Sequence, residues 1–584
     1  MARLKNYIHP YVWMIALAMF IKLVGSALEL LIPYLMEMIL DDVVPAQEEG
    51  QIYIYGGLMI LCAAGCLVAN IMANRMSAVS AGRITKAIRH DLFARLEGLS
   101  ARQLDELTIP SAESRLTSDT YNINQLLARV QRLGVRAPIL LIGGVAMTLS
   151  MDAPLALVLI GMLPIIALVV YQVTKHSIPL YTRQQSVLDR VVRVVQENIT
   201  GIRVIKALSK TEYEKKRFSK VNDELTAVDQ KAGIITSLTN PTATLVLNLG
   251  LTLVVVVGAY RVNTGQCLGG VVVAFLQYFT MILNAMLGVT RIFVMWSKGE
   301  ASAKRVADVL ATPEDMAELT PQEPELGAPH IEFRDVTFSY TGIGTNLEHL
   351  SFRLAHGQTL GILGATGSGK TTLLRLLLRQ YDPDSGTVLI DGRDVRSIPG
   401  GELRSKFGIV FQNDFVAEGT IGDNIRFFRD VDDEAVARAA EDAQADFIAE
   451  KEGGMDAQVM VRGNNLSGGQ KQRLLIARAL AADPEILVLD DASSALDYRT
   501  DANLRWALHE KHRATTTVIV TQRISSLRHA DLILVLSDGK VIGAGKHETL
   551  IKECEEYQMI ARTQMGDGKE GEKWETPISS AAAE

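Results

Sequence analysis

Cysteine is scarce in this 584-residue chain, and no long run of like charge is present. The four cysteines, Cys62, Cys66, Cys267 and Cys554, fit neither a disulfide framework nor a set of metal ligands, so we interpret them as packing residues. The net charge of -7 is small for this length, and no nucleic-acid partner is expected. The basic first residues lead into an apolar segment without a small-residue cleavage pattern, so no removable signal peptide is expected.

Apolar residues are abundant instead. They make up 48% of the chain, and the excess lies in its first half. Six apolar segments there are each long enough to cross a bilayer as a helix. The approximate spans are residues 12–40, 52–81, 133–150, 155–175, 233–260 and 268–296. The sequence therefore predicts an α-helical membrane domain of six transmembrane helices over residues 1–298.

Lysine and arginine are distributed unevenly between the connections. Residues 41–51 and 151–154 contain neither, whereas residues 75–136 and 175–231 are rich in both. The positive-inside rule places both termini and these two long connections in the cytoplasm of a multi-pass cell-membrane protein. Ile84, Ile88, Leu92 and Leu96 recur at helical spacing, so we expect the long connections to extend the membrane helices into the cytoplasm.

The second half of the chain has the composition of a soluble α/β domain. A short helical piece around residues 301–310 and an acidic, proline-bearing stretch after it predict a linker over residues 299–329. A P-loop ATPase domain then occupies residues 330–565. Residues 566–584 are polar, small and aperiodic, which predicts a disordered tail.

A glycine-rich loop follows the first strongly apolar strand of this domain. Such a loop closes backbone N–H groups around phosphate oxygens, and the following helix adds its positive dipole end. Lys370 is then expected to contact the β- and γ-phosphates, and Thr371 to hold Mg²⁺. The residues expected to bind the nucleotide are Gly364, Thr366, Gly367, Ser368, Gly369, Lys370, Thr371 and Thr372.

Two further segments favour phosphate chemistry. Residues 486–490 form an apolar strand that ends in Asp490, an arrangement that places a carboxylate beside Mg²⁺. Between this strand and the glycine loop, a small-residue segment opens a helix and offers a second phosphate-binding surface. Its residues are Leu466, Ser467, Gly468, Gly469 and Gln470.

These motifs, in this order, resemble those of the ATP-binding cassette family, specifically exporters that fuse six membrane helices to one cassette. The resemblance covers nearly the whole chain and implies an ATP hydrolase coupled to transport, with ATP and Mg²⁺ as cofactors. It implies that Tyr340 stacks on adenine and that Gln412 contacts Mg²⁺ and links the nucleotide to the membrane part. It also implies that Ser494 and Asp497 communicate between sites. Ordinary packing is the alternative for Tyr340 and Gln412.

Three positions depart from the family pattern. Asp491 stands where the family has the Glu that acts as base, and its side chain is one methylene shorter. A displacement of about 1 Å can cost on the order of 10²-fold in rate. Gln522 replaces a His expected at the γ-phosphate, and an amide carries no positive charge. Val461 stands where the family has Glu, which puts cross-talk between domains in doubt there.

Cassettes of this family pair head to tail, so the resemblance places each ATP between one P-loop and the partner's signature segment. Asp491 and Gln522 weaken the site on this chain's own P-loop, while residues 466–470 serve the other site. This division is similar to heterodimeric bacterial multidrug exporters and implies a second half-transporter chain as partner. A slow homodimer and an ATP-gated regulator or channel-like protein are the alternatives.

We expect the substrate to be a hydrophobic or amphipathic compound that is exported outward across the lipid membrane. Polar groups inside the apolar helices are the residues that indicate where it binds. Lys22 and Glu29 on the first helix are expected to face a cavity or a partner, because an intramembrane charge costs roughly 2.5–3.5 kcal/mol on insertion scales. Lys22 reaching the cytoplasmic surface is an alternative.

The apolar and amide side chains of the last membrane helix are predicted to form either an adaptable wall of the substrate site or ordinary contacts between helices. The side chains concerned are Phe275, Gln277, Phe279, Asn284, Met286 and Phe293. Short helices near residues 111–121 and 211–218 are expected to pass motion from the cassette to the membrane.

Overall fold

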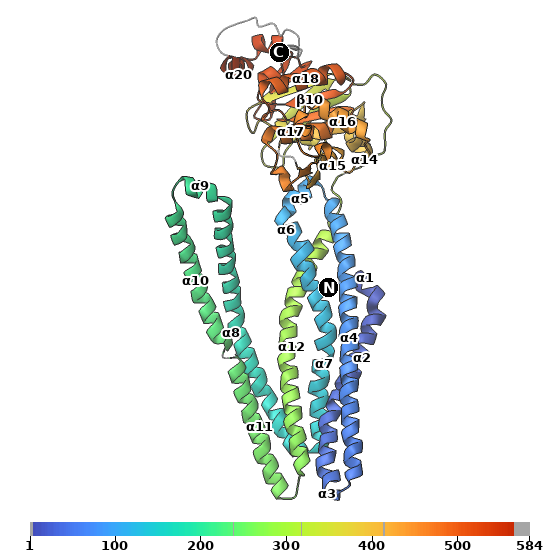
Figure 1. Ribbon diagram of the computed structural model, residues 1–584, viewed down its shortest axis with the longest axis vertical. Coiled ribbons are helices and arrows are strands. Elements are labelled where there is room, and N and C mark those ends of the chain that lie inside the picture. The colour runs from blue at the N-terminus through green and yellow to red at the C-terminus, as the bar shows by residue number, and fades with distance from the viewer. Residues whose placement is uncertain (1–3, 238, 317, 413–414, 566–584) are drawn as a thin grey trace. The chain divides into compact units, whose positions relative to one another are not determined.

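The computed structural model describes residues 4–237, 239–316, 318–412 and 415–565 (Figure 1). The chain divides into two compact units. The helical unit comprises Met1–Gly98 and Leu107–Thr312, and the α/β unit comprises Leu99–Glu106 and Pro313–Glu584. The tail expected at residues 566–584 lies outside the described residues.

Long α-helices make up nearly all of the helical unit. Its elements are α1 (Lys5–Ile8), η2 (His9–Tyr11), α2 (Val12–Met38), η3 (Ile39–Val43), α3 (Val44–Ala46), α4 (Glu49–Glu97), α6 (Ile109–Ser114), η4 (Arg115–Asp119), α7 (Thr120–Met151), α8 (Ala153–Thr200), α9 (Ile202–Ala207), α10 (Thr211–Ser237), α11 (Thr239–Asn263) and α12 (Gly269–Leu310). Among the described residues, five helical stretches are long and apolar enough to cross a membrane, and the shorter apolar stretch Ala153–Leu168 opens α8. An all-helical membrane region is therefore confirmed.

The helices continue well beyond the length that a bilayer needs, as the helical spacing in the long connections predicts. Helix α4 has 49 residues and α8 has 48, whereas about 20 suffice to span the hydrocarbon core. Ile84, Ile88 and Leu92 are almost fully buried along one side of α4. Helix α9 joins α8 to α10, which run side by side (Figure 1).

The short helical piece expected around residues 301–310 is the end of helix α12. Helix α12 runs without interruption to Leu310, so residues 299–310 belong to it. The helix ends just before Thr312 and Pro313, because the residue that precedes a proline is disfavoured in the helical conformation.

The α/β unit contains α5 (Ala101–Leu107), whose last residue lies across the boundary, and two sheets with their helices. The four-stranded sheet has the order β2-β1-β4-β5, and the six-stranded sheet has the order β12-β11-β3-β10-β9-β6. The strands of the two sheets are β1 (Ile331–Phe338), β2 (Leu347–Leu354), β3 (Thr359–Gly364), β4 (Ser385–Ile390), β5 (Arg393–Asp394), β6 (Phe407–Val410), β9 (Ile486–Asp490), β10 (Thr516–Val520), β11 (Leu532–Ser537) and β12 (Lys540–Gly545).

A third, two-stranded sheet pairs β7 (Gly419–Thr420) with β8 (Gln458–Val459). The main helices of the unit are α13 (Lys370–Leu377), α14 (Gly400–Ser405), α15 (Ile421–Arg426), α16 (Asp433–Asp442), α17 (Gly468–Leu480), α18 (Tyr498–Lys511), α19 (His547–Glu553) and α20 (Glu555–Met565).

Parallel pairing in the six-stranded sheet decides where the functional loops lie. Strands β11, β3, β10, β9 and β6 are mutually parallel, and only β12 at the end of the sheet is antiparallel. Strand β9 is buried along its whole length, as its unbroken apolar run requires. The carboxyl ends of β3, β10, β9 and β6 therefore meet at one side of the sheet, the carboxyl edge. Their amino ends form the opposite amino edge.

A short segment between α4 and α6 packs as part of the α/β unit. Asp105 accepts a 2.5 Å hydrogen bond from Tyr381 Oη, which with burial raises the pKa of Tyr381 to about 12. Gln103 Nε2 donates to the Pro313 carbonyl at 2.7 Å, and Ala101 packs against the core. Leu99–Glu106, which packs with the α/β unit, lies just before the short helices expected near residues 111–121.

Candidate nucleotide site

Four loops converge at the carboxyl edge of the six-stranded sheet. The glycine loop follows β3, Gln522 follows β10, Asp490 and Asp491 end β9, and Gln412 follows β6. Strand β10 lies between β3 and β9, so the loops that carry Gln522 and the two carboxylates are neighbours of the glycine loop. The structure thus brings together side chains that are up to 158 positions apart between Gly364 and Gln522.

The glycine loop has a backbone that side chains could not replace. Gly367 and Gly369 have φ values of +86° and +103°, a region that L-residues rarely adopt. A Cβ atom on Gly369 would lie 2.8 Å from Leu347 Cδ2, and one on Gly364 would lie 2.4 Å from the Leu536 carbonyl oxygen. At these two positions the loop is therefore closely packed against β2 and β11.

The hydroxyl residues of the loop differ in exposure. Thr366 and Thr371 are exposed, whereas Ser368 and Thr372 are buried. Within the described part of the chain, Ser368 Oγ has no hydrogen-bond partner. Thr371, in the first turn of α13, is accessible to a ligand at the carboxyl edge.

Lys370 closes over the loop that precedes it. Its Nζ donates to the carbonyls of Gly364 and Ala365 at 2.8 and 2.7 Å. Burial lowers the pKa of Lys370, while the charges of Asp490 and Asp491 act in the opposite direction. The ammonium group and the two carboxylates therefore share one electrostatic environment.

Asp490 and Asp491 differ in burial and backbone conformation. Asp490 is 4% exposed, and burial, followed by the charge of Asp491, raises its pKa. Asp491 has a left-handed φ of +51°, which Asp tolerates better than most residues. Its N–H donates to the Val520 carbonyl at 2.9 Å, which ties it to β10. Burial also raises the pKa of Asp491, against the lowering influence of Arg523.

The turn that carries Gln522 is fastened by the last described helix, α20. The Gln522 side chain is exposed. The backbone carbonyl of Gln522 accepts a 2.6 Å hydrogen bond from Gln564 Nε2. Gln564 Oε1 in turn accepts from the Ile524 N–H at 2.9 Å. Gln564 thus holds both sides of the turn. No motif in the sequence points to it, because the contact depends on how α20 folds back.

Tyr340 lies beside the helix that the glycine loop opens. Its ring makes edge-on contacts with Phe338 and Tyr381, with centroids 4.9 and 5.1 Å away. Its hydroxyl lies 3.3 Å from both Thr372 Oγ1 and the Arg375 guanidinium. The half-buried ring therefore has a packing role, and it also lies close to the glycine loop. Gln412 is exposed just beyond β6.

The signature segment forms a capped helix start. Ser467 Oγ accepts from the Gln470 N–H at 3.2 Å, and Gln470 Oε1 accepts from the Ser467 N–H at 3.0 Å. This reciprocal pair is a capping box, which leaves Gly468 and Gly469 in the first turn of α17. Leu466 is buried and anchors the segment in the core.

The loop between β9 and α18 is held from two sides. Gln472 Nε2 donates to Ser494 Oγ at 2.9 Å, and Gln472 Oε1 accepts from the Ala495 N–H at 2.9 Å. Arg523 donates to the Ser494 carbonyl at 2.9 Å. Asp497 caps α18 by accepting from Thr500 N and Oγ1. Sequence reasoning missed Gln472, which connects the signature helix to this loop.

The intramembrane charges of α2 find partners within the helical unit. Glu29 forms a two-bond ion pair with Arg136 of α7, with distances of 2.7 and 3.2 Å. Lys22 is 5% exposed and donates to Asn70 and Asn74 of α4. Lys22 therefore bonds inside the unit instead of reaching a surface.

Helix packing accounts for the two phenylalanines of α12 whose side chains are described. Phe275 is fully buried and Phe279 is 2% exposed, both in apolar clusters with α8 and α11. Of the two interpretations of these side chains, ordinary helix packing therefore holds at both positions. Met286 is partly buried, and the Phe293 side chain lies outside the described set. Gln277 and Asn284 are exposed and line a groove between α11 and α12.

Comparison with known proteins agrees with this geometry. The family described as ABC transporter transmembrane region matches residues 15–286, and the family described as ABC transporter matches residues 347–494. A solved structure of a bacterial Atm1-family ABC exporter with ATP bound is similar, with a TM-score of 0.80 and 25% identity. The similarity covers 96% of this chain and 99% of that chain.

Two curated relatives come from Mycobacterium tuberculosis. An uncharacterized ABC transporter ATP-binding protein is 34% identical over 578 residues, which is 97% of this chain and 98% of that protein. A fatty acid ABC transporter ATP-binding/permease protein is 34% identical over 454 residues, which is 77% of this chain and 71% of that protein. The chain therefore belongs to the ABC transporter family, as a multi-pass exporter subunit whose membrane region is fused to one ATP-binding cassette.

Proposed function

We propose that this chain is one subunit of a heterodimeric exporter, and that the ATP site on its own P-loop is the slower of two sites. The observation that carries the proposal is the convergence of Asp491 and Gln522 with Lys370 at one edge of the sheet. Of the three departures from the family pattern, these two fall on that edge, and Val461 precedes the signature segment. The signature helix that serves the second site keeps its complete motif.

Nucleotide binding at the carboxyl edge uses the groups already described. Lys370 and the N–H groups of residues 364–372 bind the phosphates, and Tyr340 stacks on the adenine. The oxygen ligands at this edge, from Thr371, Asp490 and Gln412, are of the kind that Mg²⁺ prefers. Mg²⁺, when bound, neutralises charge on the β- and γ-phosphates.

Slow hydrolysis at this site follows from the two replacements. The Asp491 carboxylate ends one methylene short of the position that a Glu base reaches, and its backbone is fixed by the hydrogen bond to Val520. Gln522 can orient a water by hydrogen bonding but adds no positive charge at the γ-phosphate. The site therefore binds ATP and holds the dimer closed while the partner's site turns over.

The signature segment of this chain completes that partner site. Ser467 and the first-turn N–H groups of α17 present donors and a helix N-terminus to the partner's γ-phosphate. Ser494 and Asp497 couple the two ATP sites, because Gln472 of α17 bonds to the loop that contains them.

Hydrophobic or amphipathic compounds are the proposed substrates. The groove between α11 and α12 has a volume of about 920 Å³ and mixes amide and hydroxyl groups with aliphatic side chains. The polar lining residues are Asn248, Thr252, Gln277, Thr280 and Asn284. A relative whose name specifies fatty acid transport favours this substrate class. The lysine and arginine asymmetry supports cytoplasmic termini and a cytoplasmic cassette.

The test is to compare this chain purified alone with the complex isolated from its native membrane. We expect mass analysis of the native complex to reveal a second half-transporter chain, and the chain alone to hydrolyse ATP much more slowly. Equal turnover by the chain alone and by the native preparation would overturn the heterodimer.

A further inference from the structure

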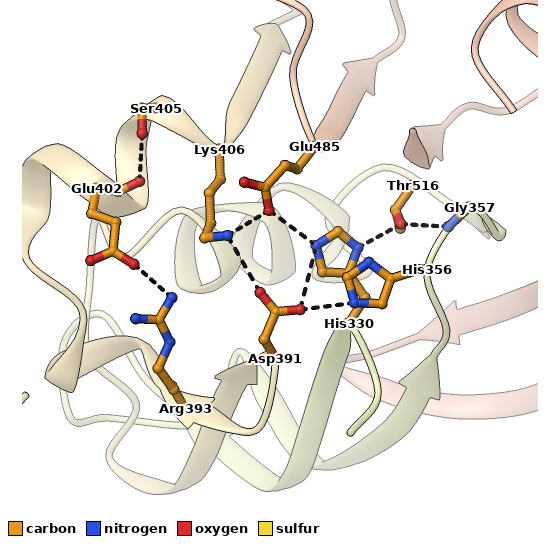
Figure 2. Close-up of polar contacts among 10 residues, drawn as sticks. All are labelled: His330, His356, Gly357, Asp391, Arg393, Glu402, Ser405, Lys406, Glu485 and Thr516. Atoms are coloured by element: carbon orange, nitrogen blue, oxygen red, sulfur yellow. Dashed lines mark hydrogen bonds and ion pairs between the residues drawn. The ribbon is translucent and has the colours of Figure 1, made fainter. Parts of the chain in front are cut away.

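A second cluster of titratable side chains lies at the amino edge of the six-stranded sheet, away from the nucleotide site. His330 immediately precedes β1, His356 follows β2 and Asp391 follows β4, while Glu485 immediately precedes β9. Figure 2 shows the two imidazole rings and the two carboxylates turned toward one another. The ligand atoms of His330, His356 and Asp391 all lie within 4.8 Å of one another.

The separations suit a small metal ion. His356 Nε2 lies 3.0 Å from Asp391 Oδ1, and His330 Nε2 lies 3.8 Å from the same oxygen. His330 Nε2 is 3.9 Å from Glu485 Oε2. Tetrahedral ligands bonded to Zn²⁺ at about 2.0–2.1 Å are roughly 3.4 Å apart. Rotation of the two exposed side chains, His356 and Glu485, would therefore bring these atoms into a coordination shell.

A buried nitrogen without a partner aims into the cluster. His330 is 1% exposed, and within the described residues its Nε2 has no hydrogen-bond partner. Its Nδ1 lies 2.6 Å from Thr516 Oγ1, which already accepts from the Gly357 N–H at 3.0 Å. A bound metal would select the tautomer in which Nδ1 donates to the second lone pair of Thr516 Oγ1, and in that tautomer the Nε2 lone pair points at the carboxylates. Metal-bound histidines are oriented by the same kind of bond at the other ring nitrogen.

The charged side chains of the cluster have a net negative charge, which favours a bound cation. Lys406 contacts Glu485 Oε2 and lies 3.4 Å from Asp391 Oδ2, so Asp391 Oδ1 stays turned toward the histidines. Asp391 and Glu485 outweigh the single ammonium group by one negative charge. The His330 and His356 rings stack with centroids 3.8 Å apart and planes at 11°, so the exposed His356 ring must turn for both nitrogens to reach one ion.

We propose that His330, His356 and Asp391 bind one divalent transition-metal ion of the zinc class, with Glu485 as the fourth ligand. Two imidazoles favour Zn²⁺, Ni²⁺ or Cu²⁺ over Mg²⁺ or Ca²⁺, which prefer oxygen ligands. The ion would join three loops of the four-stranded sheet to the start of β9 in the six-stranded sheet. It would thereby stabilise the α/β unit.

This site is separate from the expected Mg²⁺ position. Glu485 precedes β9 and Asp490 ends it, so the two sites lie at opposite ends of a five-residue strand. At about 3.3 Å per residue, that strand separates them by roughly 17 Å. Metal binding at the amino edge can therefore be measured without nucleotide.

The test uses the tag-free full-length chain in detergent, free of nucleotide, titrated with Co²⁺ and with Zn²⁺ against a chromophoric chelator. We expect one tight site per chain and the intense visible absorption of tetrahedral Co²⁺. His356→Asn should weaken binding by more than about tenfold, as changes around bound metals typically do. His356 is largely exposed, with 62% of its side chain accessible, so the variant should fold.

His349→Asn is the matched control. His349 is also exposed and lies 2.7 Å from a carboxylate, Asp335, but belongs to no three-ligand group among the described residues. It should leave binding unchanged. Zn²⁺ should also raise the unfolding temperature of the wild-type protein and of His349→Asn, but not of His356→Asn. Absence of a tight site, or equal binding by the wild type and His356→Asn, would overturn the proposal.

Discussion

The catalytic side of the nucleotide site and the signature helix belong to one α/β unit, yet they differ in how closely they follow the family pattern. At the carboxyl edge, Asp491 and Gln522 stand where the family resemblance leads us to expect Glu and His. At the signature, Ser467 and Gln470 form a complete capping box, and Gly468 and Gly469 occupy the first turn of α17. Two of the three departures, at Asp491 and Gln522, lie on the side that this chain supplies to its own ATP, whereas Val461 precedes the signature segment.

The scaffold under both sides is intact. Gln472 fastens the signature helix to the loop after β9, and Arg523 fastens the turn after β10 to the same loop. Asp491 keeps its backbone bond to β10. These contacts hold the loops of the site in place although the two reacting groups differ from the family pattern. This arrangement supports the proposal that this chain's own site binds ATP but hydrolyses it slowly.

The largest effect should come from Gly469→Asp in the assembled transporter, which we expect to abolish steady-state ATP turnover. The new carboxylate would face the γ-phosphate in the partner's site, where each donor aimed at developing charge contributes about 10²–10³-fold. Gly469→Ala is the control, because it adds the same Cβ, at a tight 3.1 Å from the Ala495 carbonyl oxygen, without the charge. The ATPase rate at saturating ATP should fall much less in the control. Equal loss in both variants would assign the effect to crowding.

Lys370→Ala should have an intermediate effect. Its ammonium group contacts the glycine-loop carbonyls and shares the field of Asp490 and Asp491, so its loss weakens phosphate binding at this chain's own site. The weak site must still hold ATP to keep the dimer closed. Nucleotide affinity and turnover should be measured on the same preparation. An effect no larger than that of Asp491→Asn would argue against this holding role.

Asp491→Asn should lower turnover of the assembled transporter only modestly. The expected loss is far below the about 10²–10⁴-fold that a general base typically contributes, because this site is already slow. The equivalent substitution of the partner chain's base should have the full effect. If Asp491→Asn proves as damaging as Gly469→Asp, the roles assigned to the two sides are reversed.

The smallest effect concerns pH and the helix that holds the Gln522 turn. His547 Nδ1 lies 2.7 Å from the hydroxyl of the fully buried Tyr557 in α20. Burial, together with Arg528 and His529 and against Glu548, lowers the pKa of His547 below 6.5. Its contribution to stability is therefore complete above pH 6.5 and is lost as the pH falls through the lowered pKa.

Hydrogen exchange of α20 amides, corrected for the intrinsic pH dependence, should show this loosening on acidification. His547→Gln should remove most of the pH dependence. Protection of α20 that stays constant below pH 6.5 in the wild type would contradict the prediction.

The sequence predicts that the motifs of the nucleotide site lie close together, because they follow apolar strands. Parallel strands bring their carboxyl ends to the same edge of a sheet. Each motif of the site can be recognised from consecutive residues alone, as at the glycine loop, Asp490 and the signature segment. Gln472 and Gln564 could not be predicted, since each acts through a single side chain whose partner depends on how separate loops pack.

The helical unit shows the same limit. Apolar length predicts the membrane helices, and helical spacing predicts their extension past the bilayer. The docking of Leu99–Glu106 into the α/β unit has no such signature, because it rests on contacts such as that between Asp105 and Tyr381. The histidine cluster likewise draws on residues that no motif spacing connects.

The central claim is that Asp491 and Gln522 are what slows this chain's own site. The most direct measurement is the ATPase rate of the chain purified alone, compared with the double variant Asp491→Glu, Gln522→His. Every site in such a homomeric assembly combines this chain's P-loop with its own intact signature. We predict a rise on the order of 10²-fold in the double variant, as restored alignment of a catalytic group allows. An unchanged rate, with ATP binding retained, would contradict the account.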